Sequence, residues 1–121
     1  MDPKSAINHL YADALEIYER ARAEVMIERS DGRRQKYAAV HDKQQIDRGY
    51  DAGLLVPAIA GIVKNRTSDF DHLEEAHRPD LMLETRVVDG SKPYHHLFVE
   101  KTLRAAKVRM DDYWARHPED E

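Results

Sequence analysis

Histidines close to carboxylates are the first residues in this sequence whose types could support chemistry, because both are common metal ligands. His72, Glu75 and His77 lie within one short stretch, and His96 precedes Glu100 by four residues. On a helix, His72 and Glu75 share a face, as do His96 and Glu100. A carboxylate-bridged metal site in a helical bundle takes Glu-x-x-His from paired helices, and neither stretch has that order. The sequence therefore predicts surface or capping histidines, with no metal site and no cofactor.

Arg34 and His41 form the one pair with an enzymatic interpretation. The pair is similar to one in some helical ribonucleases, which place an arginine and a histidine a few residues apart on one helix facing a dimer cleft. There His41 would be the general acid or base, and Arg34 would hold the phosphate. The polar residue expected beside the arginine is only Gln35, and two residues at so loose a spacing often occur by chance. A nucleic-acid-associated protein or a helical ribonuclease that uses Arg34 and His41 is therefore the alternative hypothesis.

Two clusters of basic residues could contact nucleic acid: Arg33, Arg34 and Lys36 in the first third of the chain, and Lys101, Arg104 and Lys107 near its end. Proteins that depend on phosphate contacts usually carry a basic excess. This chain has 19 Lys and Arg residues against 23 Asp and Glu residues, which gives a net charge of −4. Solvated helix faces explain the clusters better, so nucleic acid is not the favoured partner.

Nucleophilic catalysis has no support in the sequence. The chain has no cysteine, and its serines (Ser5, Ser30, Ser68 and Ser91) occupy positions typical of helix caps and turns. No glycine-rich phosphate loop is present. These observations favour a non-enzymatic protein.

The absence of cysteine also excludes disulfides and thiolate metal sites, and it makes a reducing compartment the natural expectation. No apolar run approaches the roughly 20 residues that span a membrane. The first residues, Met1 to Lys4, lack the basic region and apolar core of a secretion signal. We therefore expect a cytoplasmic protein that does not act at a membrane.

Residues 4–29 are predicted to form one long helix, with Asp2 as its cap and Pro3 at its first position. At 1.5 Å per residue it would be roughly 39 Å long, more than a compact domain of this size needs. Its apolar stripe is formed by Leu10, Tyr11, Ala14, Ile17, Tyr18, Ala21 and Val25. If the shorter helices leave this stripe uncovered, it is the expected interface of a homodimer or of a complex with another protein. The alternative is that the second and last helices cover it.

The remaining periodicity predicts helices over residues 34–48, 51–65, 69–77 and 81–88, and a last helix that ends near residue 117. The segment 51–65 is apolar almost all round, which is typical of a central, buried helix. A strand is the rival interpretation of residues 81–88, but no partner strand is evident. Together the segments predict an all-α fold, a compact bundle of about six helices with a long N-terminal helix. It forms one domain over residues 1–121, with a helical core over 34–117 and an acidic tail at 118–121.

The core is expected to hold apolar residues from each of the later helices. The residues predicted to be nearly buried are Leu54, Ile59, Ile62, Phe70, Leu73, Leu81, Phe98, Leu103 and Ala106.

Residues 70–113 carry a spaced pattern of apolar and charged residues: Phe70, Leu73, Arg78, Asp80, Leu81, Glu84, Val88, Leu97, Phe98, Ala106, Arg109 and Tyr113. This pattern resembles that of a family of small uncharacterised bacterial helical proteins. The resemblance implies a helical domain and no particular activity. Val99 stands where members often have a threonine or serine cap, which leaves the start of the last helix open.

Four charged residues within this pattern have a structural interpretation. Arg78 and Arg109 are candidates to pair with Asp80 and Glu84, which would clamp the two short helices onto the last helix. The leading hypothesis for the whole chain is therefore a non-enzymatic helical module that binds a protein, most simply a second copy of itself through the first helix.

Overall fold

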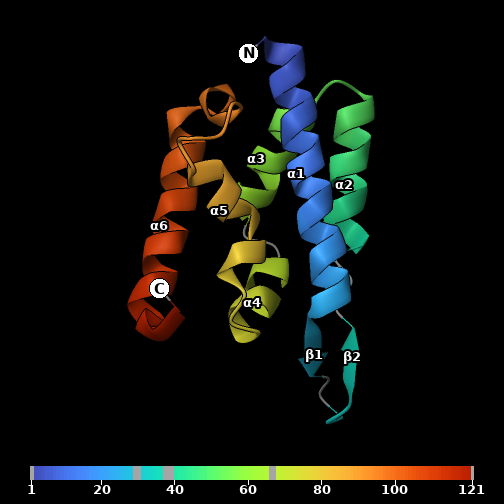
Figure 1. The fold of residues 1–121 in the computed structure, drawn as a ribbon, viewed down its shortest axis with the longest axis vertical. Coiled ribbons are helices and arrows are strands. Elements are labelled where there is room, and N and C mark those ends of the chain that lie inside the picture. The colour runs from blue at the N-terminus through green and yellow to red at the C-terminus, as the bar shows by residue number, and fades with distance from the viewer. Residues whose placement is uncertain (1, 29–30, 37–39, 66–67, 121) are drawn as a thin grey trace.

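The computed structural model describes residues 2–28, 31–36, 40–65 and 68–120. Its α-helices are α1 (Pro3–Glu24), α2 (Val40–Asp51), α3 (Leu55–Asn65), α4 (Ser68–Glu75), α5 (Leu83–Val88) and α6 (Glu100–Arg116). Short 3-10 turns cover Pro79–Leu81, His95–Leu97 and Pro118–Asp120. In Figure 1, α6 runs along one side of the bundle and α2 along the other, with α1, α3 and α5 between them. The predicted all-α bundle with a long first helix is confirmed.

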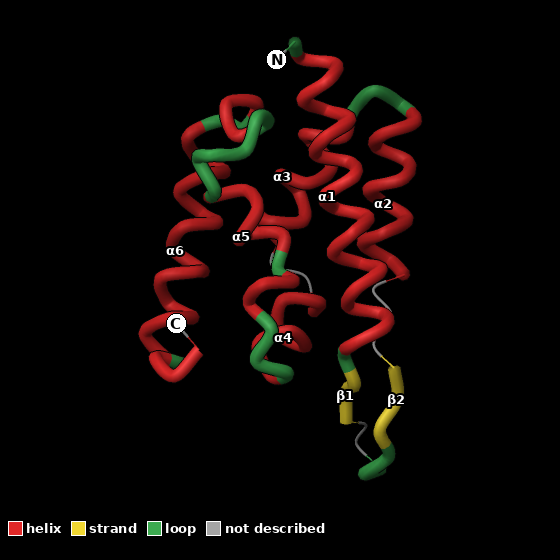
Figure 2. The backbone as a smooth tube through the Cα atoms, in the orientation of Figure 1, coloured by secondary structure: helices red, strands yellow, loops and turns green. Residues whose placement is uncertain are grey.

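The connection between the first two helices differs from the prediction. Instead of helix to residue 29 and again from 34, the chain forms strands β1 (Met26–Glu28) and β2 (Arg34–Lys36). The strands pair antiparallel, with Met26 opposite Lys36, and extend beyond the end of the bundle (Figure 2). Residues Val25 to Ile27 include two β-branched side chains, which favour extended backbone over helix. Gly32, with φ +83°, lies in the hairpin connection and does not end a helix.

Helix α1 is the longest element, and its apolar stripe is buried against other elements of the same chain. The Asp2 carboxylate accepts a hydrogen bond from the Ser5 backbone N–H at 2.9 Å, so Asp2 caps the helix as predicted. The stripe residues Leu10, Ala14, Ile17, Tyr18, Ala21 and Val25 are all buried. Tyr11 is partly buried and stacks on Tyr50 with 4.0 Å between ring centroids. The expectation that this stripe is left uncovered is wrong, because α2, α3, α5 and the turn at 79–81 all pack against α1.

Helix α3 is the central helix that its composition predicted. Leu55, Ile59, Ile62 and Val63 are buried. The prediction that Leu54 is buried is wrong, since 57% of it is exposed. The reason is that α3 begins at Leu55, four residues later than expected, after Gly53 turns the chain with φ +74°.

The segment from α4 to α6 follows the predicted order with one interruption. Residues 81–88 are not one helix, because Met82 is extended between the turn that ends at Leu81 and the start of α5. The strand alternative is excluded for residues 83–88, which are helical. Helix α6 begins at Glu100, with Val99 as a cap residue that makes no side-chain hydrogen bond. The other predicted core residues are buried except Leu103, which is only partly buried.

The irregular segment between α5 and α6 is fixed to α1 by Tyr94. Its ring is fully buried, and its hydroxyl donates to Asp13 at 2.7 Å. The Lys92 ammonium lies 3.5 Å from the same carboxylate. Burial, reinforced by the hydrogen bond to Asp13, raises the pKa of Tyr94, so the hydroxyl stays protonated as a donor. This contact ties the segment before α6 to α1.

Among the described residues, no helix is long and apolar enough to cross a membrane.

Removing the buried methyl groups of Ile62 should destabilise the bundle. We expect Ile62→Ala to lower the free energy of unfolding by about 2–5 kcal/mol, because a large apolar residue is removed from a packed site. The matched control is Leu54→Ala, which should cost less than about 0.5 kcal/mol because that side chain is exposed. Urea unfolding measures both, and similar losses for the two variants would contradict the arrangement of α3.

Candidate functional site

Helix α6 is held against the bundle by a buried apolar face. Ala106, Met110 and Tyr113 are buried on this face, and α6 packs against both α5 and α3. The opposite face carries exposed residues, including Val108, of which 52% is exposed. The inner face thus fixes the position of the helix, and the outer face is free to contact other molecules.

Arg109 fixes α6 to α5 through an ion pair and to α3 through a hydrogen bond. The Arg109 guanidinium lies 3.2 Å from the Glu84 carboxylate of α5, and a second nitrogen donates to the Lys64 carbonyl at 3.2 Å, near the end of α3. Both side chains are largely buried, with exposures of 14% for Arg109 and 6% for Glu84. Burial raises the pKa of Glu84, and the cation of Arg109 acts in the opposite direction. The positive charge also suits the C-terminal end of α3, where carbonyl groups lack partners.

The second predicted pair, Arg78 and Asp80, has a different role from the one expected. The Arg78 guanidinium lies 3.0 Å from Asp80 and 3.1 Å from Glu24 at the end of α1. Arg20 reaches both of these carboxylates. Hydrogen bonds from Arg78 hold the pKa of Asp80 below its usual value. The prediction that Arg78 clamps onto the last helix is therefore wrong, since the network joins the turn at 79–81 to α1.

A hollow between α3 and α6 is the candidate binding surface. We call it the α3–α6 groove, and its lining residues are Ala60, Gly61, Lys64, Lys101, Thr102 and Ala105. Its volume is about 280 Å³. Small side chains form much of the lining, and a methyl group added at Gly61 would meet no atom within 4 Å. An adjoining hollow shares Lys101 and Ala105 and adds the exposed Val108.

The two lysines that line this groove differ from the neighbouring cations of α6 in their ion pairing. Arg104 pairs with Glu100 at 2.6 Å, and Lys107 pairs with Asp111 at 2.9 Å. Lys64 and Lys101 form no ion pair with any residue that the structure describes. Two cations without a carboxylate therefore flank a lining of small residues, which is a suitable site for a negatively charged group.

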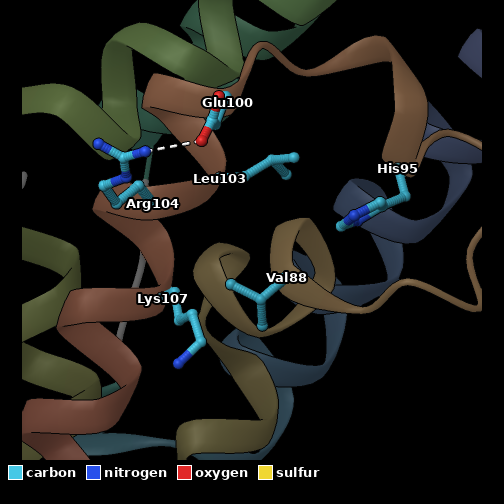
Figure 3. Close-up of a pocket in the computed structure, with 6 residues that line it drawn as sticks. All are labelled: Val88, His95, Glu100, Leu103, Arg104 and Lys107. Atoms are coloured by element: carbon cyan, nitrogen blue, oxygen red, sulfur yellow. Dashed lines mark hydrogen bonds and ion pairs between the residues drawn. The ribbon is translucent and has the colours of Figure 1, made fainter.

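A second hollow lies on the other side of α6. Figure 3 shows it between Val88 and His95 on one side and Leu103 with Lys107 on α6. The dashed line marks the ion pair between Arg104 and Glu100, which are four residues apart on α6. His95 contacts the Val87 carbonyl at 3.1 Å through its Nδ1 atom. Because its polar groups have partners within the chain, this hollow is the weaker candidate.

The predicted pair Arg34 and His41 does not lie on one helix. Arg34 belongs to β2 and His41 belongs to α2, so the helical spacing on which the ribonuclease interpretation depends is wrong. The side chains of both residues, and that of Lys36, lie outside what the structure describes. Arg33 is exposed, with 83% of its side chain accessible, in the hairpin connection.

A cluster of possible metal ligands lies where α6 ends. His77, His117, Glu119 and Asp120 each offer one ligand atom, and these atoms all lie within 4.8 Å of one another. His77 Nδ1 is 2.8 Å from Asp120 and 3.9 Å from Glu119, whose carboxylate is 3.5 Å from His117 Nδ1. In the sequence, the nearby residues that could share a metal with His77 are His72 and Glu75, and neither belongs to this cluster. The partners of His77 follow it by about forty residues, and no local spacing indicates them.

Three further residues support this cluster from within the fold. Glu74 lies 3.0 Å from His117 Nε2 and receives two hydrogen bonds from Arg116, at 2.9 and 3.0 Å. The Tyr113 hydroxyl donates to Asp120. Burial and this hydrogen bond raise the pKa of Tyr113, while the Tyr113 and His77 contacts lower that of Asp120. His77 has a positive φ of 57°, an uncommon conformation for a residue with a side chain.

Comparison of the chain with protein-family models, with curated proteins and with solved structures finds no match. The resemblance of residues 70–113 to small bacterial helical proteins therefore stays a prediction.

Removing Arg109 should destabilise the protein in a pH-dependent way. We expect Arg109→Met to cost about 3–5 kcal/mol near neutral pH, because it leaves the buried Glu84 carboxylate without its cation. Without that cation the pKa of Glu84 rises further. The cost is therefore largest above this pKa and falls as acid protonates the carboxylate.

Urea unfolding at pH 7.5 and pH 5 measures this difference. The control is Arg104→Met on the same helix, whose exposed ion pair should be worth less than about 1 kcal/mol at either pH. A cost of Arg109→Met that is small, or that stays constant between the two pH values, would contradict the role given to the pair.

Proposed function

We propose that the protein is a non-enzymatic helical module that binds an acidic segment of another protein in the α3–α6 groove. The observation that carries this proposal is the pair of lysines, Lys64 and Lys101, that flank a lining of small residues and have no carboxylate partner among the described residues. A carboxylate of the partner would lie between the two ammonium groups. An adjacent apolar side chain would pack on Ala60, Gly61 and Ala105 and continue toward Val108.

Binding fits the groove better than catalysis does. A catalytic site needs an acid, a base or a nucleophile within hydrogen-bonding reach of the substrate. The groove lining contains two lysines and the hydroxyl of Thr102, which act as nucleophiles only when a base or a lowered pKa activates them. No carboxylate or imidazole that could activate them lies among its six residues. Protein-binding surfaces, by contrast, commonly combine a small apolar depression with charges at its edge.

A protein is a better partner for this groove than a nucleic acid. Nucleic acid recognition relies on several cations that neutralise successive phosphates. Here Arg104 and Lys107 are engaged with neighbouring carboxylates, and the chain as a whole is negative, with a net charge of −4. The exposed Val108 and the alanines of the groove favour an apolar contact next to the acidic one.

Self-association through α1 is not part of this proposal. Its basis was an uncovered apolar stripe, and residues such as Leu10, Ile17 and Tyr18 are buried within a single chain. A pairing of first helices would have to expose this core first. The groove between α3 and α6 involves neither α1 nor the hairpin.

Fluorescence anisotropy with a labelled peptide of alternating leucine and glutamate tests the proposal. We expect the peptide to bind, and Lys101→Glu to weaken it by about tenfold, equivalent to about 1.4 kcal/mol. Gly61→Leu should also weaken binding, because the new side chain fills the groove. It should not lower the melting temperature, since leucine is a better helix former than glycine.

The charge-matched control is Lys4→Glu, an exposed residue at the start of α1 that should leave peptide binding unchanged. An oligothymidylate of equal length is the second probe. Tighter binding of the oligothymidylate, with a steep loss of affinity in salt, would favour the nucleic-acid alternative and contradict the proposal. Equal effects of Lys4→Glu and Lys101→Glu would also contradict it.

A further inference from the structure

We propose that His77, His117, Glu119 and Asp120 bind a divalent cation of the zinc class at the end of the bundle. The site is independent of the α3–α6 groove, with which it shares no residue. Its ligands come from three places in the chain. His77 lies two residues after α4, His117 directly follows α6, and Glu119 and Asp120 belong to the 3-10 turn at 118–120.

The spacing of the ligand atoms fits a tetrahedral zinc site. Zinc bonds of 2.0–2.1 Å place neighbouring ligand atoms about 3.3 Å apart. The distances of 2.8 Å, 3.5 Å and 3.9 Å between the histidine nitrogens and the carboxylates bracket this value. All four ligand atoms lie within 4.8 Å of one another, so each pair reaches this spacing if its separation changes by at most about 1.5 Å.

The surroundings of His117 are those of a metal-bound histidine. Ligating histidines commonly hold their second ring nitrogen against a carboxylate, which fixes the tautomer and the ring orientation. Glu74 holds His117 Nε2 at 3.0 Å and is itself fixed by Arg116. With the proton on Nε2, the lone pair of Nδ1 is directed toward Glu119 and the rest of the cluster.

His77 and Asp120 complete the site. His77 adopts a left-handed backbone conformation, in which its Nδ1 lies beside Asp120. Tyr113 donates to the Asp120 carboxylate and fixes its position. A bound cation replaces the direct contact between His77 Nδ1 and Asp120.

The donor set determines which cation is favoured. Two imidazoles and two carboxylates suit zinc and its first-row neighbours, whereas magnesium and calcium prefer sites made of oxygen ligands alone. His77 and Glu119 are about half exposed, with 50% and 59% of their side chains accessible, so an ion has a path into the site. The bound cation would tie the region after α4 to the end of α6.

Isothermal titration calorimetry of the untagged full chain with zinc chloride tests the site. We expect binding of one ion per chain, and we expect His77→Ala and His117→Ala each to weaken it at least tenfold. Glu74→Gln should weaken it about tenfold as well, the effect of removing an outer-shell carboxylate.

The control variant is His96→Ala, which removes an exposed histidine outside the cluster and should leave zinc affinity unchanged. Glu119→Gln provides a further test at a mostly exposed position if an alanine variant fails to fold, and it should also weaken binding. Zinc should raise the melting temperature, and magnesium should not. Absence of binding, or equal affinity in the native protein and in His77→Ala or Glu119→Gln, would overturn the proposal.

Discussion

The buried contact between Glu84 and Arg109 is the interaction on which the position of α6 depends. A carboxylate and a guanidinium removed from water lose much of their hydration, so neither tolerates the loss of its partner. Arg109 contacts α5 through Glu84 and α3 through the Lys64 carbonyl, at 3.2 Å in each case. The buried apolar face of α6 holds it against the bundle, and this contact adds directional partners on both α5 and α3. The contact thus fixes α6 to two helices at once.

Fixing α6 has consequences for both candidate sites. The α3–α6 groove exists only while Lys101 and Ala105 of α6 lie opposite Gly61 and Lys64 of α3. The same helix carries Tyr113 and Arg116 and leads directly into His117, the 3-10 turn and the cluster of ligands. One rigid helix therefore presents a groove along its length and a possible metal site at its end.

The helices could be predicted from the sequence where apolar residues recur at helical spacing, as Ile59 and Ile62 do in α3. The hairpin could not, because residues 26–28 and 34–36 are too short to show an alternating pattern, and Gly32 suits a helix end as well as a turn. The buried stripe of α1 could not be assigned to core or interface by length arguments, since four elements together cover it. The ligand cluster was missed because His77 meets His117 only through the tertiary fold.

The central claim is that the α3–α6 groove is the binding surface of this protein. The most direct test is a two-dimensional 1H–15N spectrum of the labelled chain, recorded while the leucine–glutamate peptide is added. The account predicts that the largest shifts occur at the amides of Gly61, Lys64, Lys101 and Ala105. Shifts confined to the hairpin around Arg33 or to α1, or no shifts at all, would contradict it.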